Sequence, residues 1–393
     1  MIRKSLIETI FEAASIERWN DHIRPSRGFT ELDKQSHKLL GAYILGKLQP
    51  GIDWLKLIEG GIFEFLHRLV LTDIKPPIFH RLMKEKGEEL NRWVIEEMRT
   101  DMEAIPGGFL ERFERYFTDP DYSKAEKQVL EAAHYLATKW EFDIIFDMCH
   151  TYYGIANTRR EIDDKLRGLE TLPCMDAFMK NNNYQGFINL LGELRFQQRW
   201  SRSARIPATS VIGHMLIVAM LSYFCSCEMD ACPQRKINNF LGGLFHDIPE
   251  VLTRDIVSPV KNSVAGLDAL IKSIEQEQME KVVYPLIPTE WKEQIAYYTD
   301  DEFSDKLILD GKLTYTTVEE INEKYNKDEY MPVDGQVIRA CDHLAACMET
   351  YMSHMCGVTT HTLQEGNRDL YLRYRNAEIG GIDFGCLFEY FRI

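Results

Sequence analysis

The stretch that decides the interpretation of this chain, residues 245–255, reads Phe-His-Asp-Ile-Pro-Glu-Val-Leu-Thr-Arg-Asp. It places His246 directly before Asp247, while His214 lies upstream and Asp342 downstream, each in an apolar segment with helical periodicity. Two imidazoles and two carboxylates held on packed helices make a mixed nitrogen and oxygen site for one divalent metal. We therefore predict that these four residues are metal ligands.

The same ligand set indicates the chemistry of the site. It suits Mn²⁺, Co²⁺, Fe²⁺, Ni²⁺ or Zn²⁺ and leaves positions open for water and phosphate. Glu250 follows the His-Asp pair by one helical turn, so its carboxylate can face the same cavity. Each residue could instead have a purely structural role: His214 could be a core histidine, and Asp342 could pair with Arg339 one turn earlier. The ordered set favours the metal site over these separate explanations.

Composition limits the class of protein. The 393 residues suffice for two domains, and the net charge of −15 argues against a general nucleic-acid or anionic-membrane surface. Nine cysteines without a disulfide framework indicate a reducing cytoplasm, and no signal peptide is apparent. The apolar segment 211–227 is short for a membrane span and contains His214, so we interpret it as a buried central helix.

Helical periodicity dominates the chain, and little strand is expected. Residues 313–318 have strand-like composition and precede an acidic stretch at 319–329, so we interpret the two as an inserted flap. Thr209 and Ser210 are good N-caps for the helix that carries His214. The segments with the clearest helical spacing are 84–101, 124–149, 211–227, 267–283 and 336–352.

The chain also resembles itself at an offset of about 181 residues. Residues 17–19, Glu-Arg-Trp, match 198–200, Gln-Arg-Trp, and Val-Leu-Thr recurs at 70–72 and 251–253. The alignment sets His37 opposite His214, and His134 opposite Asp342. The counterparts of His246, Asp247 and Glu250 are then Phe65, Leu66 and Leu69. Shared helical composition is the alternative explanation, but a repeat implies a first copy that cannot hold a catalytic metal.

Residues 194–352 resemble the HD-domain metal-dependent phosphohydrolases, and within them the bacterial 5′-deoxynucleotidase (YfbR-like) branch. The motifs that carry the resemblance are Arg199-Trp200, then His214, then residues 246–261, then Asp342. The His-Asp pair is generic, whereas the Glu-Val-Leu-Thr-x-Asp extension narrows the match. The resemblance implies an all-α fold of tandem HD-type helical domains with a small β-like insertion in the second. We expect a degenerate domain without a metal site over residues 1–165 and a catalytic domain over 166–393.

The resemblance also implies roles for individual residues. Glu250 would be the general acid/base that orients the attacking water. Arg199, Trp200 and Asp255 would recognise the 5′-phosphate and the deoxyribose, with Lys261 as a further candidate. The chain departs from the family in two places. Gly213 stands where many members have an acid, and residues 310–334 form an insertion relative to compact members.

The function that follows is metal-dependent hydrolysis of a phosphate monoester, with a (deoxy)nucleoside 5′-monophosphate as the favoured substrate. The alternatives are hydrolysis of another nucleotide, such as a triphosphate or a signalling nucleotide, and a nucleotide-binding regulatory protein with little activity. A two-iron oxygenase of the same fold is disfavoured by the lack of further paired His and Asp ligands. We expect a cytoplasmic protein that binds a small phosphate substrate, with no nucleic-acid or membrane partner. A homodimer is left open.

Overall fold

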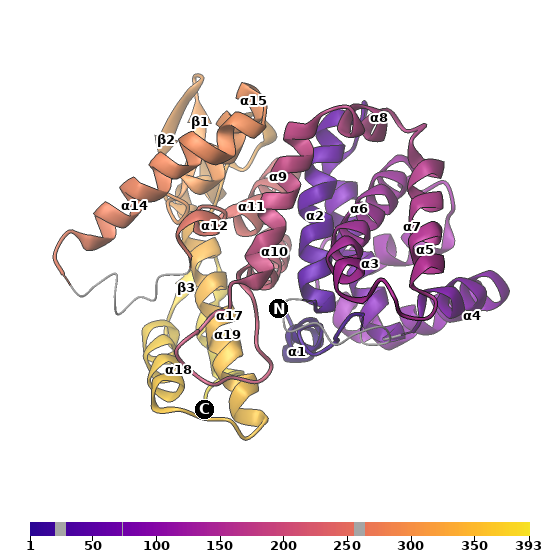
Figure 1. Cartoon of the computed structure of the whole chain (residues 1–393). Helices are drawn as coiled ribbons and strands as arrows, with labels where there is room; N and C mark the ends of the chain where they lie inside the picture. The colour runs from indigo at the N-terminus through magenta and orange to yellow at the C-terminus, as the bar shows by residue number, and fades with distance from the viewer. Residues whose placement is uncertain (20–28, 73, 255–263) are drawn as a thin grey trace.

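The computed structural model describes residues 1–19, 29–72, 74–254 and 264–393. Almost all regular structure in these residues is helical, and the strands form only two short two-stranded sheets. The predicted all-α fold is therefore confirmed. Figure 1 shows the first half of the chain on one side of the molecule and the second half on the other, with α2 and α10 between them.

The first half is built around α2. This helix packs against α3, α6, α8 and α9. Thr30 caps it by accepting a hydrogen bond from the amide of Asp33, and Asp33 returns the bond to complete a capping box. The helices are α1 (Lys4–Glu12), α2 (Glu31–Leu48), α3 (Trp54–Leu71), α4 (Pro76–Glu103), α5 (Phe109–Thr118), α6 (Lys124–Cys149), α7 (Ile155–Leu169), α8 (Pro173–Met179) and α9 (Asn182–Gly192).

The second half is built around α10, which packs against α11 and α17. Its larger elements are α10 (Val211–Glu228), α11 (Pro233–Phe245), α12 (Glu250–Thr253), α14 (Leu267–Gln278), α15 (Thr289–Thr299), α17 (Gly335–Met355), α18 (His361–Tyr374) and α19 (Phe384–Glu389). Its short elements are η1 (Glu193–Phe196), η2 (Met279–Val283), η3 (Tyr284–Leu286), α16 (Val318–Glu320), η4 (Ile321–Tyr325), η5 (Asp328–Tyr330), and the strands β1 (Lys306–Leu309), β2 (Lys312–Tyr315), β3 (Glu378–Ile379) and β4 (Ile382–Asp383).

Helix α10 is apolar on every side, and such a helix must be buried all round. Every residue from Val211 to Cys227 is buried. Ser210 is the N-cap, as predicted, because its hydroxyl accepts a hydrogen bond from the amide of Gly213. Among the described residues α10 alone is long and apolar enough to cross a membrane, and 94% of its apolar window is buried inside the molecule.

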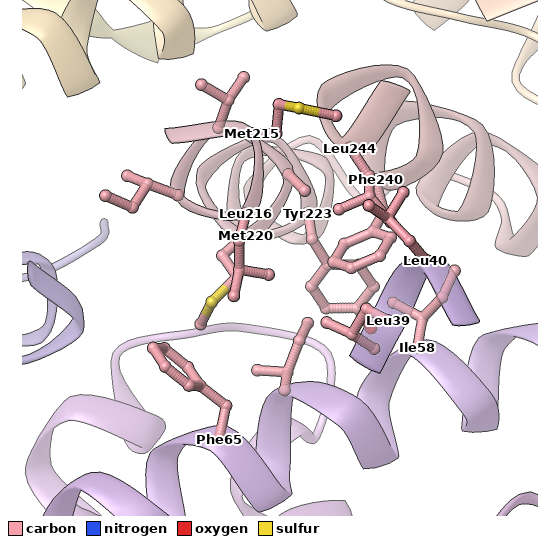
Figure 2. Packing of buried hydrophobic residues seen from close by; sticks show 14 of the residues in the cluster. Leu39, Leu40, Ile58, Phe65, Met215, Leu216, Met220, Tyr223, Phe240 and Leu244 are labelled. Atoms are coloured by element: carbon pink, nitrogen blue, oxygen red, sulfur yellow. The ribbon is translucent and has the colours of Figure 1, made fainter. Parts of the chain in front are cut away.

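One hydrophobic core runs through both halves. Figure 2 shows side chains of α2 and α3, among them Leu39 and Ile58, facing Leu216 and Tyr223 of α10 and Phe240 of α11. The Tyr223 hydroxyl also donates a hydrogen bond of 2.5 Å to Glu59 of α3, which carries a polar contact across the same boundary. The two halves therefore share one buried apolar core rather than having separate cores.

The predicted flap is a hairpin of different extent. Strand β2 ends at Tyr315 rather than 318, and its antiparallel partner β1 lies upstream, where we expected no strand. The polar stretch that follows folds into short helical turns from Val318 to Tyr330. A half-buried strand alternates apolar and polar residues, but in β1 the neighbours Lys306 and Leu307 are both buried. The sequence of β1 therefore lacks the alternation that would have predicted a strand.

The predicted boundary between residues 165 and 166 falls inside α7. Helices on both sides of that point belong to one packed group, since α7 packs against α6, while α8 and α9 pack against α2. A chain break at this position would cut a continuous helix rather than a linker.

Candidate metal centre

Three of the four predicted ligands come together from three helices. His214 lies on α10, His246 directly follows α11, and Asp342 lies on α17. One potential ligand atom of each residue lies within 4.8 Å of the others. His214 Nε2 is 2.8 Å from Asp342 Oδ1. Both histidines are buried, so only the packing of α10, α11 and α17 can bring these atoms together.

The environment of His246 prepares one ring nitrogen for a metal. Its Nδ1 donates a hydrogen bond of 2.8 Å to the carbonyl of Gly243, which leaves the Nε2 lone pair facing inward. Among the described residues this buried Nε2 has no hydrogen-bond partner. Asp247 Oδ2, from the fourth predicted ligand, lies 3.1 Å from the same Nε2. An unsatisfied buried nitrogen beside two carboxylates fits a cation between them.

The charges of the cluster are strongly coupled. Burial lowers the pKa of His246, but the Asp247 carboxylate outweighs it and raises the pKa to about 9. Burial raises the pKa of Asp247, but His246 and Arg199 lower it to about 2. For Asp342 burial is likewise outweighed by His214 and Arg199, and its pKa is lowered well below the ordinary range. Both carboxylates are therefore ionised at neutral pH, as ligands of a divalent cation must be.

Glu250 is placed beside this cluster by a turn rather than by one continuous helix. Helix α11 ends at Phe245, and α12 begins at Glu250 after Pro249. The Gln197 side chain donates a hydrogen bond of 3.1 Å to the Glu250 carbonyl and helps to fix the turn. Glu250 is 7% exposed and lines one cavity together with His246 and Asp247. Glu250 therefore lines the same cavity as His246 and Asp247, and its catalytic role stays a prediction.

The cavity has a volume of about 260 Å³, and its described lining is strongly acidic. Besides Asp247 and Glu250 it contains one lysine, Lys272, which pairs with Glu302 at 3.6 Å. The remaining lining carboxylates are Asp268, Glu275, Asp300, Asp301 and Glu302.

Arg199 lies on the other side of the cluster. Its guanidinium is 3.6 Å from Asp247 Oδ2, 3.9 Å from Asp342 Oδ1 and 3.7 Å from Glu349 Oε2. These separations are longer than a charge-assisted hydrogen bond, so the guanidinium is shared among three carboxylates. It is not among the residues that line the acidic cavity.

Trp200 makes packing contacts beside the cluster, and its role in sugar recognition stays a prediction. Its indole Nε1 donates a hydrogen bond of 2.7 Å to Glu349, and its ring packs so closely on α18 that a Cβ at Gly366 would lie 2.8 Å from it. The ring is not among the cavity-lining residues either. These contacts match the packing alternative for Trp200 rather than sugar stacking.

Glu349 is the buried residue of the site that sequence reasoning missed. Besides Trp200, its carboxylate accepts a hydrogen bond from the Thr209 hydroxyl, and it lies 3.8 Å from His214 Nδ1 and 3.7 Å from Arg205. Burial raises its pKa, but Arg205, Arg199 and His214 outweigh this and lower it. The available signal was its spacing, seven residues after Asp342 and hence on the same face of α17. Of the other predicted residues, Asp255 and Lys261 lie outside the described residues.

The first half contains a related but metal-free arrangement. Counting from the N-caps Thr30 and Ser210, the residue opposite His214 is Lys34 and not His37. The His37 alignment is therefore off by three residues. His37 is a satisfied core histidine, since its Nδ1 accepts from Arg195 and its Nε2 donates to the Ile188 carbonyl, both at 2.9 Å.

His134, in contrast, does lie where the sequence alignment set it. Its Nδ1 contacts the Lys34 ammonium, just as Asp342 contacts His214 in the second half. A lysine and a histidine offer no carboxylate oxygen to a metal, so this pair lacks the charged ligand that Asp342 provides in the second half.

The Arg-Trp pair is also repeated in space. Trp19 Nε1 donates a hydrogen bond of 2.9 Å to Glu141, as Trp200 does to Glu349, and both tryptophans have a positive φ, 63° and 55°. Arg18 Nε pairs with Glu141 at 2.8 Å, much closer than Arg199 Nε to Glu349. The contact of an Arg-Trp pair with a buried glutamate therefore occurs in both halves, and the shorter Arg Nε–Glu separation is the one in the first half.

Residues 191–371 match the family model for the HD domain, so this part of the chain is an HD domain. Among curated proteins it is similar to the 5′-deoxynucleotidase of Cronobacter sakazakii, with 28% identity over 30% of this chain and 63% of that protein. The 5′-deoxynucleotidase YfbR of Shigella flexneri is 28% identical over 30% of this chain and 62% of its own length. The chain thus spans about three fifths of these relatives. No solved structure matches it.

Proposed function

We propose that this protein is a metal-dependent phosphohydrolase that releases phosphate from (deoxy)nucleoside 5′-monophosphates in the cytoplasm. The observation that carries the proposal is the convergence of His214, His246 and Asp342, with the Asp247 carboxylate 3.1 Å from the buried Nε2 of His246. Similarity to 5′-deoxynucleotidases supports the substrate class. The first half, in this proposal, is a degenerate copy without a metal.

The residues divide the chemistry among them. His214, His246, Asp247 and Asp342 would hold one divalent transition metal, which when bound polarises a phosphoryl oxygen and lowers the pKa of water. Glu250, on the cavity wall beside His246, would take the proton of the attacking water. Arg199 would bind the phosphate, since its guanidinium lies beside Asp247 and Asp342 and its planar fork suits bidentate contact with a phosphate.

The acidic cavity bears on the competing substrates. A polyphosphate chain would place further negative charge against Asp300, Asp301 and Glu302, whereas a nucleoside offers hydroxyl and amino donors to the same carboxylates. A monophosphate is therefore favoured over a triphosphate. A purely regulatory binder would have no use for a carboxylate where Glu250 lies.

The test combines metal analysis with a phosphate-release screen. We expect about one transition metal per chain in protein grown with Mn²⁺ and Co²⁺, and release from nucleoside monophosphates well above triphosphates. Asp247→Ala should lose both metal and activity, because a mononuclear site cannot replace a charged ligand. Wild-type protein that takes up none of these metals would refute the proposal.

A further inference from the structure

The N-terminus of α10 is where the first half of the chain comes closest to the metal cluster. His214 is the fourth residue of this helix, and its amide donates the first helical hydrogen bond, 3.0 Å long, to the carbonyl of Ser210. The Ser210 hydroxyl accepts from the amide of Gly213 at 3.0 Å. The position of Ser210 therefore sets where the helix starts and how far along its axis His214 lies.

The Ser210 hydroxyl is itself held by a residue of the first half. It donates a hydrogen bond to Oδ1 of Asp33 in α2, and Asp33 is only 3% exposed. The other oxygen of Asp33 accepts from the Thr30 hydroxyl at 2.8 Å. One buried carboxylate thus completes the N-cap of α2 and fixes the hydroxyl orientation at the N-cap of α10.

Gly213 is what permits this approach. A Cβ at Gly213 would lie 3.0 Å from Asp33 Oδ1 and 3.0 Å from a methyl group of Leu32. The Leu32 side chain is fully packed at 1% exposed, so neither neighbour can withdraw freely. A glycine in the first turn of a helix otherwise weakens it relative to alanine, and here it makes room for a side chain from the other half.

We propose that Asp33 is a positioning residue for the metal site, through which the first half holds the start of α10 so that His214 meets Asp342. The proposal rests on the proposed metal-dependent function, and it gives the metal-free half a definite task. Asp33 is neither in the ligand cluster nor among the cavity-lining residues, and it acts through Ser210. Removing the Asp33 carboxylate should therefore weaken metal binding more than removing the N-cap side chain of a helix that does not contact α10.

The experiment uses the full chain and two readouts, Mn²⁺ affinity and amide hydrogen exchange across residues 211–215 without metal. We expect Asp33→Ala to weaken Mn²⁺ binding by about 10–100-fold, as for residues that orient ligands, and to speed exchange at the start of α10. Asp33→Asn should recover most of the affinity, because its amide oxygen can still accept from Ser210. Gly213→Ala should act in the same direction as Asp33→Ala, by displacing the carboxylate.

Two control variants match these changes. Asp53 caps α3 in the first half by accepting from the amides of Leu55 and Lys56, and Asp53→Ala should alter neither readout. At Gly41 in α2 a Cβ would meet only Ala133 at 3.8 Å, so Gly41→Ala should also bind Mn²⁺ normally.

The outcomes separate this proposal from the proposed function. Wild-type affinity in Asp33→Ala, or an equal loss in Asp53→Ala, would overturn the positioning role. If Asp33→Ala does not fold, the comparison of Gly213→Ala with the control Gly41→Ala decides. A loss of Mn²⁺ affinity and faster exchange in Gly213→Ala alone would support the proposal, and equal values in the two variants would overturn it. If the wild type binds no Mn²⁺, the proposed function fails. In that case, unchanged hydrogen exchange in Asp33→Ala would also overturn the role of Asp33 in holding the start of α10.

Discussion

At the scale of single residues, Glu349 shows how a buried carboxylate can organise a site without being part of its chemistry. It is fully buried, accepts from Trp200 and Thr209, and is surrounded by Arg199, Arg205 and His214. Buried charges are tolerated only when paired and hydrogen-bonded in this way. Its counterpart Glu141 is equally buried in the first half, where it accepts hydrogen bonds from Arg18 and Trp19. The contact of an Arg-Trp pair with a buried glutamate is therefore a property of the fold, onto which the second half adds metal ligands.

Replacing Glu250 separates chemistry from metal binding. Glu250→Gln should keep the metal and the fold, because the amide is nearly isosteric, while kcat falls by about 10²–10⁴-fold because an amide cannot accept the proton. Metal content by mass spectrometry and steady-state kinetics on a nucleoside monophosphate measure both. A variant as active as the wild type would remove Glu250 from the mechanism.

Replacing Trp200 tests whether the indole packs or recognises substrate. Trp200→Phe removes the N–H that Glu349 accepts, and a buried carboxylate that loses one donor should cost about 1–3 kcal/mol of unfolding free energy. KM should stay within about twofold of the wild-type value, since the ring packs on Gly366 and does not line the cavity. Denaturant unfolding and kinetics give the two numbers, and a tenfold rise in KM with little loss of stability would reverse the assignment.

At the scale of the elements, the start of α17 carries a pH-dependent contact. Asp305, just before β1, accepts a hydrogen bond of 2.9 Å from the amide of Gln336 in the first turn of α17, the helix that bears Asp342. Burial raises the pKa of Asp305 to about 7. Between about pH 4 and pH 7 the folded protein therefore keeps a proton that the unfolded chain has lost, and its stability falls as pH rises through this range.

Asp305→Asn should remove this pH dependence. The amide oxygen can still accept from Gln336, so the variant should match the wild type below about pH 4, and the difference in stability should grow between pH 5 and pH 7. At pH 8 it should be more stable, by an amount on the order of 2 kcal/mol, because the wild type must then bury a charge. Thermal unfolding of both proteins from pH 5 to pH 8 measures the difference. Parallel curves for the two proteins would show that Asp305 does not titrate in this range.

At the scale of the whole molecule, the two halves share a core. Leu216 and Tyr223 of α10 and Phe240 of α11 pack on residues of α2 and α3, and Asp33 caps α10 from the first half. Separating the halves would expose this apolar face to water. The shared core, rather than a linker, joins the two halves, so we expect the second half to need the first half in order to fold.

A fragment of residues 191–393 contains every proposed ligand but should aggregate or unfold when produced alone, because the face that α2 and α3 cover is apolar. Co-expression with residues 1–190 should restore a soluble complex that binds metal. Size-exclusion chromatography and metal analysis of both preparations measure this. A soluble, monomeric fragment with full metal content would show that the first half is dispensable for the site.

The sequence by itself determined the helices and the ligand types of this protein. The segment 124–149 is helix α6 to the residue, Ser210 is the cap of α10, and His214, His246, Asp247 and Asp342 gather as their order predicted. These features follow from local periodicity, capping chemistry and a resemblance carried by short motifs. Only the tertiary structure showed that Lys34 contacts His134, that Glu349 accepts a hydrogen bond from Trp200, and that Asp33 accepts one from Ser210. Each of those contacts joins residues 100 or more positions apart, and such pairs are set by how whole helices pack, which no local pattern specifies.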